Sequence, residues 1–273
     1  MDAKLHFISG LPRSGSTLLS SLLRQNPRIT AGMTSPVGHL VSAMLRETSM
    51  RNEDAVFIDD EMRERLLRGV FDAYYPDAGA DGIVFDTNRM WTSKLHLVAE
   101  MFPQAKVICC VRSPAWIIDS IETLTRKNPY ELSGIFGFDS GGTIYSRADA
   151  LSGPAGMVGF AINALREAVY GPLRDRLMLV QYDTLAARPL EVLEAIHDFI
   201  GAEMGAHDPK RIKPSYDMYE FDRRLGTPGL HAVRGVVAPR LRETLLPPDL
   251  FTLHDNRAFW RDRASLPQGL RVL

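Results

Sequence analysis

A glycine-bracketed loop near the start of the chain carries the residue types of an anion-binding site. Gly10 and Gly15 enclose four residues and are followed by Ser16 and Thr17, which is the spacing of a phosphate-binding P-loop. Glycines there permit close backbone approach, and amides at a helix start bind anions. Where such a loop usually has lysine this chain has Ser16, and the cation is Arg13. The pattern predicts an anionic ligand and argues against ordinary ATP chemistry.

A second anion-binding signal follows the apolar run KVICCV, residues 106–111. Arg112 stands directly after this run, and Ser113 and Ser120 lie seven residues apart on nearly the same face of the helix predicted next. A guanidinium can form paired hydrogen bonds with phosphate oxygens. Together with the first loop, in which Ser14 adds a further hydroxyl, this segment indicates one ligand with two separated anionic groups.

The elements that must position these residues alternate between strands and helices. Leu5, Phe7 and Ile8 predict a first strand, and the leucines between 18 and 23 predict one face of a helix that stops at Asn26-Pro27. The same reasoning predicts further strands at 83–85, 106–111 and 177–182, and helices at 35–50, 60–75, 92–102, from Ser113-Pro114 through Arg126, at 157–170 and at 189–200.

This alternation predicts an α/β fold, a three-layer sandwich on a mostly parallel central sheet. Ligands in such folds lie at the carboxyl ends of the strands, where residues 9–17, Asp86 to Arg89, Arg112 and Tyr182 would share one edge. We expect a single domain over residues 1–273. The glycine-rich segment 127–156 is predicted to be a lid or an acceptor wall, and the irregular region 202–273 is predicted to complete the site.

Composition excludes several classes of protein. The 273 residues are 45% hydrophobic and 24% charged with a net charge of −1, which describes a soluble globular chain without the basic excess of a nucleic-acid-binding protein. No apolar run reaches transmembrane length and no cleavable signal is evident. Cys109 and Cys110 are adjacent in a predicted strand and should point to opposite faces as free thiols, so we expect a reducing, cytoplasmic location.

With these two anion-binding signals, the chain resembles the sulfotransferase superfamily, which uses 3′-phosphoadenosine 5′-phosphosulfate (PAPS). The segment PRSGST is similar to the family's 5′-phosphosulfate loop in its arginine form, closest to the tyrosylprotein and bacterial Golgi-like branches. Arg112 and Ser120 resemble its 3′-phosphate motif, and residues 102–114 and 180–201 resemble further family segments. The resemblance implies the P-loop nucleotide-hydrolase-like sulfotransferase fold, PAPS as donor, 3′,5′-ADP as product and no metal.

The resemblance also implies roles for individual residues. The sulfuryl acceptor could be a small molecule, a glycan, a lipid or a peptide tyrosine, and a base must deprotonate its hydroxyl or amine. His39 and Asp86 are the candidate bases, and His231 in the tail is a further one. The donor would contact Tyr182 and, near the carboxyl end, Arg234. The residues expected to hold the phosphosulfate end are Arg13, Ser14, Gly15, Ser16 and Thr17.

One departure from the family pattern leaves the activity open. Many relatives place lysine directly after the acid at the second strand exit, and this chain has Thr87 there. Arg89, or Lys94 further along, is the candidate to supply that charge. Two alternatives remain: a P-loop kinase or other phosphotransferase with a degenerate loop, and a catalytically inactive nucleotide-binding protein.

Overall fold

A six-stranded parallel sheet forms the centre of the computed structural model, which describes residues 4–79, 81–139, 142–213, 217–233, 235 and 243–273. The strand order is β2-β3-β1-β4-β5-β6, and every paired neighbour runs parallel. The strands are β1 (Lys4–Gly10), β2 (Ile29–Ala31), β3 (Ile83–Thr87), β4 (Val107–Val111), β5 (Leu177–Gln181) and β6 (Arg271–Val272). The predicted α/β fold is confirmed.

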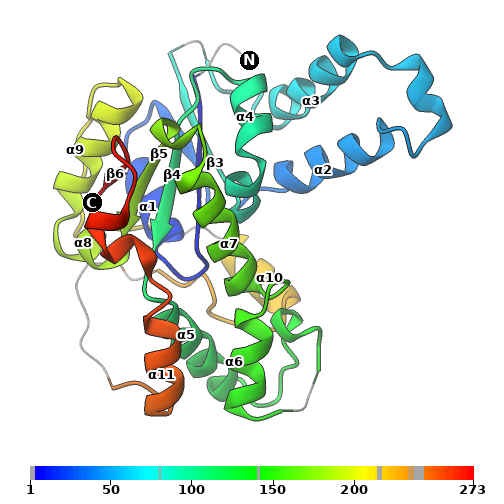
Figure 1. The fold of residues 1–273 in the computed structure, drawn as a ribbon. Coiled ribbons are helices and arrows are strands. Elements are labelled where there is room, and N and C mark those ends of the chain that lie inside the picture. Colours follow the sequence, from blue (N-terminus) through cyan, green and yellow to red (C-terminus); the bar gives the residue numbers. More distant parts are fainter. Residues whose placement is uncertain (1–3, 80, 140–141, 214–216, 234, 236–242) are drawn as a thin grey trace.

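Helices cover both faces of this sheet and its lower end (Figure 1). They are α1 (Ser16–Leu23), α2 (Val37–Glu47), α3 (Asp60–Tyr74), α4 (Leu95–Met101), α5 (Pro114–Lys127), α6 (Ile144–Ser152), α7 (Met157–Tyr170), α8 (Tyr182–Ala187), α9 (Pro189–Ile200), α10 (Asp217–Arg224) and α11 (Pro248–Asp255). Figure 1 shows α2 and α3 extending away from the sheet, and α5, α6 and α11 lying together below the ends of the strands. Along the described ranges, no helix has both the length and the apolar character needed to cross a bilayer.

The alternation of side chains along each strand builds two apolar cores. In β4, Val107, Cys109 and Val111 join the core beneath α2, α3, α4, α5 and α7, while Ile108 and Cys110 join the one beneath α1, α8 and α9. A strand covered on both faces must be apolar throughout, which is why β4 reads as an unbroken hydrophobic run. Both cysteines are free and buried on opposite faces, as predicted, and burial raises the pKa of the Cys109 thiol to about 12.

Local signals explain where several helices begin and end. The Asp59 carboxylate accepts a 2.7 Å hydrogen bond from the Met62 amide at the start of α3, and Asp60 and Glu61 occupy its first turn, where the helix dipole favours negative charge. Helix α9 begins at Pro189 and ends at Gly201, whose φ of 65° provides the left-handed cap.

Three parts of the fold differ from the sequence prediction. The segment 92–102 begins as a 3-10 helix, η2 (Arg89–Lys94), before α4 follows. Segment 127–156 contains a 3-10 helix at Gly134–Phe136 and helix α6, so it is partly helical. The tail contributes α10, α11 and the edge strand β6, which pairs with β5 through only two residues. Strands this short leave no periodic signal in the sequence.

Candidate active site

The loop between β1 and α1 is shaped by close backbone packing. Gly10 has φ of 101°, and a methyl group on its Cα would lie 2.3 Å from the Cys110 carbonyl oxygen of β4, so only glycine fits. Arg13 adopts a left-handed φ of 55°, which is uncommon outside glycine, and Gly15 follows with φ of 95°. Because Gly15 has no side chain to cap α1, the amides at the start of this helix point into the site without a capping group.

The hydroxyl groups of the loop are held close to the backbone. Ser14 is buried and its Oγ donates a 3.2 Å hydrogen bond to the Pro12 carbonyl, while Ser16 and Thr17 are half-buried in the first turn of α1. The Thr17 carbonyl accepts hydrogen bonds from Ser20 and Ser21, one turn further on. The predicted loop residues therefore lie together at the carboxyl end of β1.

The two predicted anion signals meet at this edge of the sheet. Strands β1 and β4 are neighbours although the chain between them visits β2 and β3, so their carboxyl ends flank the point where the strand order reverses. Arg13 Nε donates a 3.1 Å hydrogen bond to Ser120 Oγ on α5, and Arg112 Nη1 lies 3.5 Å from the Arg13 carbonyl oxygen. The Arg112 guanidinium stacks over the Tyr182 ring, 4.3 Å from its centre. Four predicted residues thus form one positively charged cluster.

The tyrosine also packs on the loop itself. A methyl group on Gly15 would lie 3.0 Å from Tyr182 Cδ2, so the ring supports the loop directly. Ser113, the other serine of the predicted pair, instead donates a short hydrogen bond to the Asp255 carboxylate of α11. Ser113 therefore joins α5 to α11, and Ser120 is the serine that belongs to the loop.

Asp86 lies at the exit of β3, fully buried beneath three hydrogen-bond donors. Its Oδ2 accepts from Ser35 Oγ at 2.6 Å and from Tyr75 OH at 2.7 Å, and its Oδ1 accepts from Trp91 Nε1 at 2.6 Å. Burial raises the pKa of the Asp86 carboxyl, and the three hydrogen bonds offset part of that effect. We call these four residues the Asp86 cluster. It joins β3, α3, η2 and the chain before α2.

His39 and Arg89 stand on the two elements that this cluster holds. Ser35 Oγ accepts a 3.2 Å hydrogen bond from the Val37 amide at the start of α2, and His39 lies exposed one residue beyond Gly38 in the same turn. Arg89 begins η2, and its side chain is accessible to solvent yet crowded by protein, which lowers the pKa of its guanidinium by desolvation. Thr87 Oγ1, at the end of β3, is buried with no hydrogen-bond partner among the described residues.

Comparison with known proteins identifies the family of the chain. Residues 6–206 match the sequence profile described as the sulfotransferase family. The chain belongs to the sulfotransferase family. It is 24% identical over 210 residues to protein-tyrosine sulfotransferase 2 of Gallus gallus, covering 73% of this chain and 52% of that protein. It is 25% identical over 205 residues to protein-tyrosine sulfotransferase of Drosophila melanogaster, covering 73% and 38%. The chain thus spans about half, or less, of the length of these curated relatives.

A solved structure has the same fold. The sulfotransferase domain from the curacin biosynthetic pathway aligns with a TM-score of 0.50 at 16% identity, over 99% of this chain and 94% of that one. At this identity the likeness establishes the architecture of the sulfotransferase family in this chain, and the family resemblance noted in the sequence is confirmed. In the part of the chain that the structure describes, no group of three or more His, Cys, Asp or Glu side chains is arranged to hold a metal.

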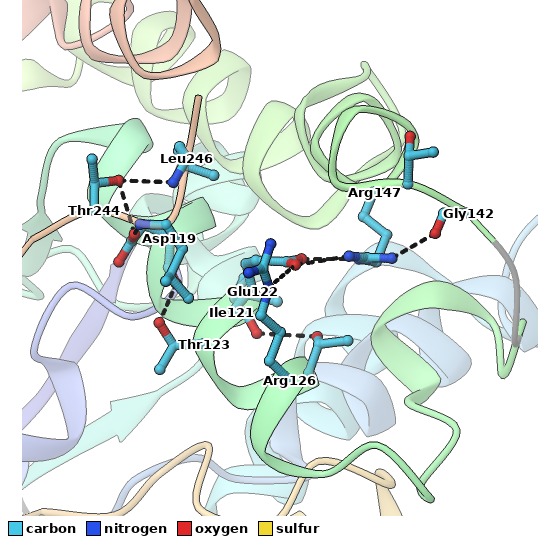
Figure 2. Close-up of polar contacts among 12 residues, drawn as sticks. Asp119, Ile121, Glu122, Thr123, Arg126, Gly142, Arg147, Thr244 and Leu246 are labelled. Carbon is cyan, nitrogen blue, oxygen red and sulfur yellow. Dashed lines mark hydrogen bonds and ion pairs between the residues drawn. The ribbon is translucent and has the colours of Figure 1, made fainter. Parts of the chain in front are cut away.

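Helix α5 of this sulfotransferase-family chain carries two further buried carboxylates beside Ser120 (Figure 2). Asp119 Oδ1 accepts hydrogen bonds from Thr244 Oγ1 at 2.9 Å and from the Leu245 amide at 2.6 Å. Glu122 receives Arg126 of α5 at 2.8 Å and Arg147 of α6 at 2.7 Å. Burial raises the pKa of the Glu122 carboxyl, but its hydrogen bonds with Arg147 and Arg126 outweigh this and lower the pKa. We call these two residues the α5 carboxylates.

Sequence reasoning missed the partners of these carboxylates. Ser35 and Tyr75 are 51 and 11 residues from Asp86, and Thr244 is 125 residues from Asp119, so no spacing rule connects them. A local signal in the sequence was available for Trp91 alone among these partners. A buried indole N–H needs an acceptor, and Trp91 stands five residues after Asp86, an acid at a strand exit. Arg234, the predicted second contact to the donor, lies outside the described residues.

Proposed function

We propose that this chain transfers a sulfuryl group from PAPS to an acceptor hydroxyl or amine. The observation that carries the proposal is the convergence of Arg13, Arg112 and Ser120 beside the uncapped amides of α1. A donor with a phosphosulfate at one end and a 3′-phosphate at the other has the two anionic groups that such a cluster can hold. Membership of the sulfotransferase family supports the assignment.

The bound donor supplies an activated sulfuryl group, and the residues of the loop would hold its phosphosulfate end. The amides from Gly15 onward, with Ser16 and Thr17, would bind that end, and Arg13 would stabilise the negative charge that grows on the departing phosphate. Arg112 and Ser120 would hold the 3′-phosphate, with Tyr182 fixing the plane of the Arg112 guanidinium. A guanidinium already stacked on a ring loses little freedom when it binds a phosphate.

On the acceptor side we assign different roles to the two candidate bases. Both oxygens of Asp86 already accept hydrogen bonds from Ser35, Tyr75 and Trp91, so a proton from an acceptor would have to displace one of them. We therefore propose that Asp86 positions the start of α2 and η2, and that exposed His39 takes the proton. Arg89 would supply the charge that the family's lysine provides elsewhere.

Calorimetry with the product 3′,5′-ADP tests the proposal. We expect binding that is unchanged by a chelator, and Arg112→Ala should weaken it by roughly 30-fold, since a charge-assisted hydrogen bond contributes about 1.5–3 kcal/mol. Arg65→Ala, at an exposed arginine of α3, should leave the affinity within about twofold. Tight binding of ATP only with Mg²⁺ would instead favour a phosphotransferase, and unchanged 3′,5′-ADP affinity in Arg112→Ala would refute the assignment.

The second candidate, a nucleotide-binding protein without activity, is favoured by the environment of Thr87. Its buried hydroxyl stands where the resemblance noted in the sequence implies a lysine in many relatives, and a hydroxyl cannot supply a positive charge to the transferring group. Thr87→Lys distinguishes the two. If Arg89 supplies the charge, wild type turns over a phenolic or amine acceptor and Arg89→Ala abolishes turnover. If the wild type is inactive, turnover should appear only in Thr87→Lys.

A further inference from the structure

Helices α2 and α3 form an arm that extends away from the sheet (Figure 1). The inner sides of the two helices pack together and against the core, through Val41, Leu67 and Phe71. Large apolar side chains that remain exposed gather on this arm; they are Leu40, Met50, Val56, Phe57, Met62 and Leu66. Single exposed apolar residues are normal on a protein surface, whereas a group of them marks a contact surface.

The outward face of α3 has a regular pattern. Four residues spaced by four, three and four lie along this face, away from the buried Leu67; they are Met62, Leu66, Gly69 and Ala73. Met62 and Leu66 are 37% and 38% exposed, and Ala73 is exposed as well. Alternating spacings of three and four are those with which one helix packs along another. We call these four residues the α3 seam.

The α3 seam has two large residues followed by two small ones. A methyl group on Gly69 would meet no other part of the described chain within 4 Å, so the space outside this residue is open. When a second copy of α3 is placed antiparallel with Leu66 facing Gly69, Met62 faces Ala73, and the two-fold axis forms each pair twice. Large side chains then fill the space beside small ones, which a parallel pair would not achieve.

Charges beside the α3 seam are complementary in the same arrangement. Arg65 and Asp72 are both exposed and lie two turns apart on one flank of the seam. In the antiparallel pair, Arg65 of each copy lies near Asp72 of the other, so two ion pairs form about the two-fold axis. An anionic membrane surface would instead be repelled by the acids at the start of α3, which are Asp59, Asp60 and Glu61.

We propose that the α3 seam binds the α3 seam of a second copy of this chain in antiparallel orientation, and that the arms thereby form a two-fold symmetric dimer. The seam belongs to a helix that extends away from the sheet, whereas the loop after β1 lies at the end of a central strand (Figure 1). The inference therefore does not depend on the proposed donor or acceptor.

Analytical ultracentrifugation of the full chain over a wide range of protein concentrations measures the equilibrium between monomer and dimer. We expect the wild type to be a dimer that dissociates on dilution. Leu66→Glu places a charge in the interface twice, because both copies carry it, and should raise the dissociation constant of the dimer roughly 100-fold or more.

Gly69→Gln separates a role in the dimer from a role in the fold. Replacing a glycine inside a helix favours the helix, and the open space outside Gly69 accommodates the new side chain in the monomer. In the dimer the same side chain occupies the place of Leu66 from the other copy. We therefore expect a dissociation constant raised roughly tenfold or more, with the melting temperature of the dilute monomer unchanged or increased.

Charge reversal tests the antiparallel arrangement. Arg65→Asp should weaken the dimer roughly tenfold, because repulsion from Asp72 replaces attraction at two places. Combining Arg65→Asp with Asp72→Arg should restore the dissociation constant to within about threefold of the wild type. The matched control is Glu194→Arg, at an exposed glutamate of α9, which should leave the equilibrium unchanged.

Four results would overturn the proposal. They are a wild type that is monomeric at every concentration, a dimer that Leu66→Glu and Gly69→Gln leave intact, a dimer that the double charge reversal fails to restore, and a monomer that uses the α3 seam to bind vesicles of phosphatidylcholine and phosphatidylglycerol. In the last case the seam would be a membrane contact.

Discussion

The Asp86 cluster and the α5 carboxylates lie at different strands of the sheet, in β3 and in the helix after β4, and are held by different chemistry. Asp86 is surrounded by neutral donors, a hydroxyl, a phenol and an indole, whereas Glu122 is paired with two guanidinium groups. Burial disfavours the charged form of both, but only Glu122 has cations that reverse the effect. The comparison shows that a buried carboxylate can join separate elements without countercharge when both of its oxygens accept hydrogen bonds.

Loss of Asp86 should have the largest effect on stability. Asp86→Ala leaves the hydroxyls of Ser35 and Tyr75 and the Trp91 indole without their acceptor in the interior, and we expect about 3 kcal/mol or more of lost unfolding free energy. Urea denaturation measures it. Asp86→Asn, which keeps one acceptor oxygen, should lose less. Equal stability of wild type and Asp86→Ala would mean that the cluster does not hold β3, α3 and η2 together.

Removing the charge of Glu122 should cost less. In Glu122→Gln the amide oxygen still accepts one hydrogen bond, and the partly exposed Arg126 can turn to solvent, so we expect about 2 kcal/mol. The control is Glu64→Gln, an i,i+4 partner of Arg68 at the surface of α3, which should change stability by less than about 0.5 kcal/mol. Equal losses in the two variants would contradict the importance of burial.

The two carboxyls should give opposite pH dependences. The raised pKa of Asp86 contributes stability below the unfolded value of about 3.9, and this contribution disappears as pH rises through the folded pKa. The lowered pKa of Glu122 contributes stability above about 4.3 that is lost as pH falls through its folded pKa. The unfolding free energy is measured from about pH 3 to pH 7. Asp86→Asn should remove a contribution to stability that falls as the pH rises, and Glu122→Gln should remove one that increases with pH. Slopes of the same sign would refute the contrast.

Single hydroxyl deletions should have the smallest effects and still differ. Tyr75→Phe removes a hydrogen bond to a buried carboxylate without countercharge and should cost about 1–1.5 kcal/mol. Thr244→Val removes the hydrogen bonds of an exposed hydroxyl with Asp119 and with the Leu246 amide. Because Asp119 Oδ1 keeps the Leu245 amide and this site is near solvent, we expect a cost of about 0.5 kcal/mol. Thermal unfolding resolves both, and a larger loss in Thr244→Val would reverse the comparison.

Much of the loop between β1 and α1 and of the Arg112 segment could be predicted because both are built from short stretches of sequence. The loop from Gly10 to Thr17 requires positive φ angles and an open helix start, and both requirements are written in adjacent residues. Arg112 follows a continuous apolar strand, which is itself diagnostic of a buried parallel position. The region around Asp86 and His39 was predicted only as single residues, since these two were recognised by type and location but the partners of Asp86 were not.

By itself, the sequence determined the α/β order of elements, the glycine-bracketed loop after β1, and the placement of Arg112 just before the helix that carries Ser120, because these depend on neighbours within a turn or a strand. Only the tertiary structure decided that Ser113 binds Asp255, that Asp86 is enclosed by three donors, and that Asp222 binds His231. Such contacts join residues far apart or on separate turns. Their free energy depends on which atoms packing brings within hydrogen-bond distance, and no periodicity encodes that.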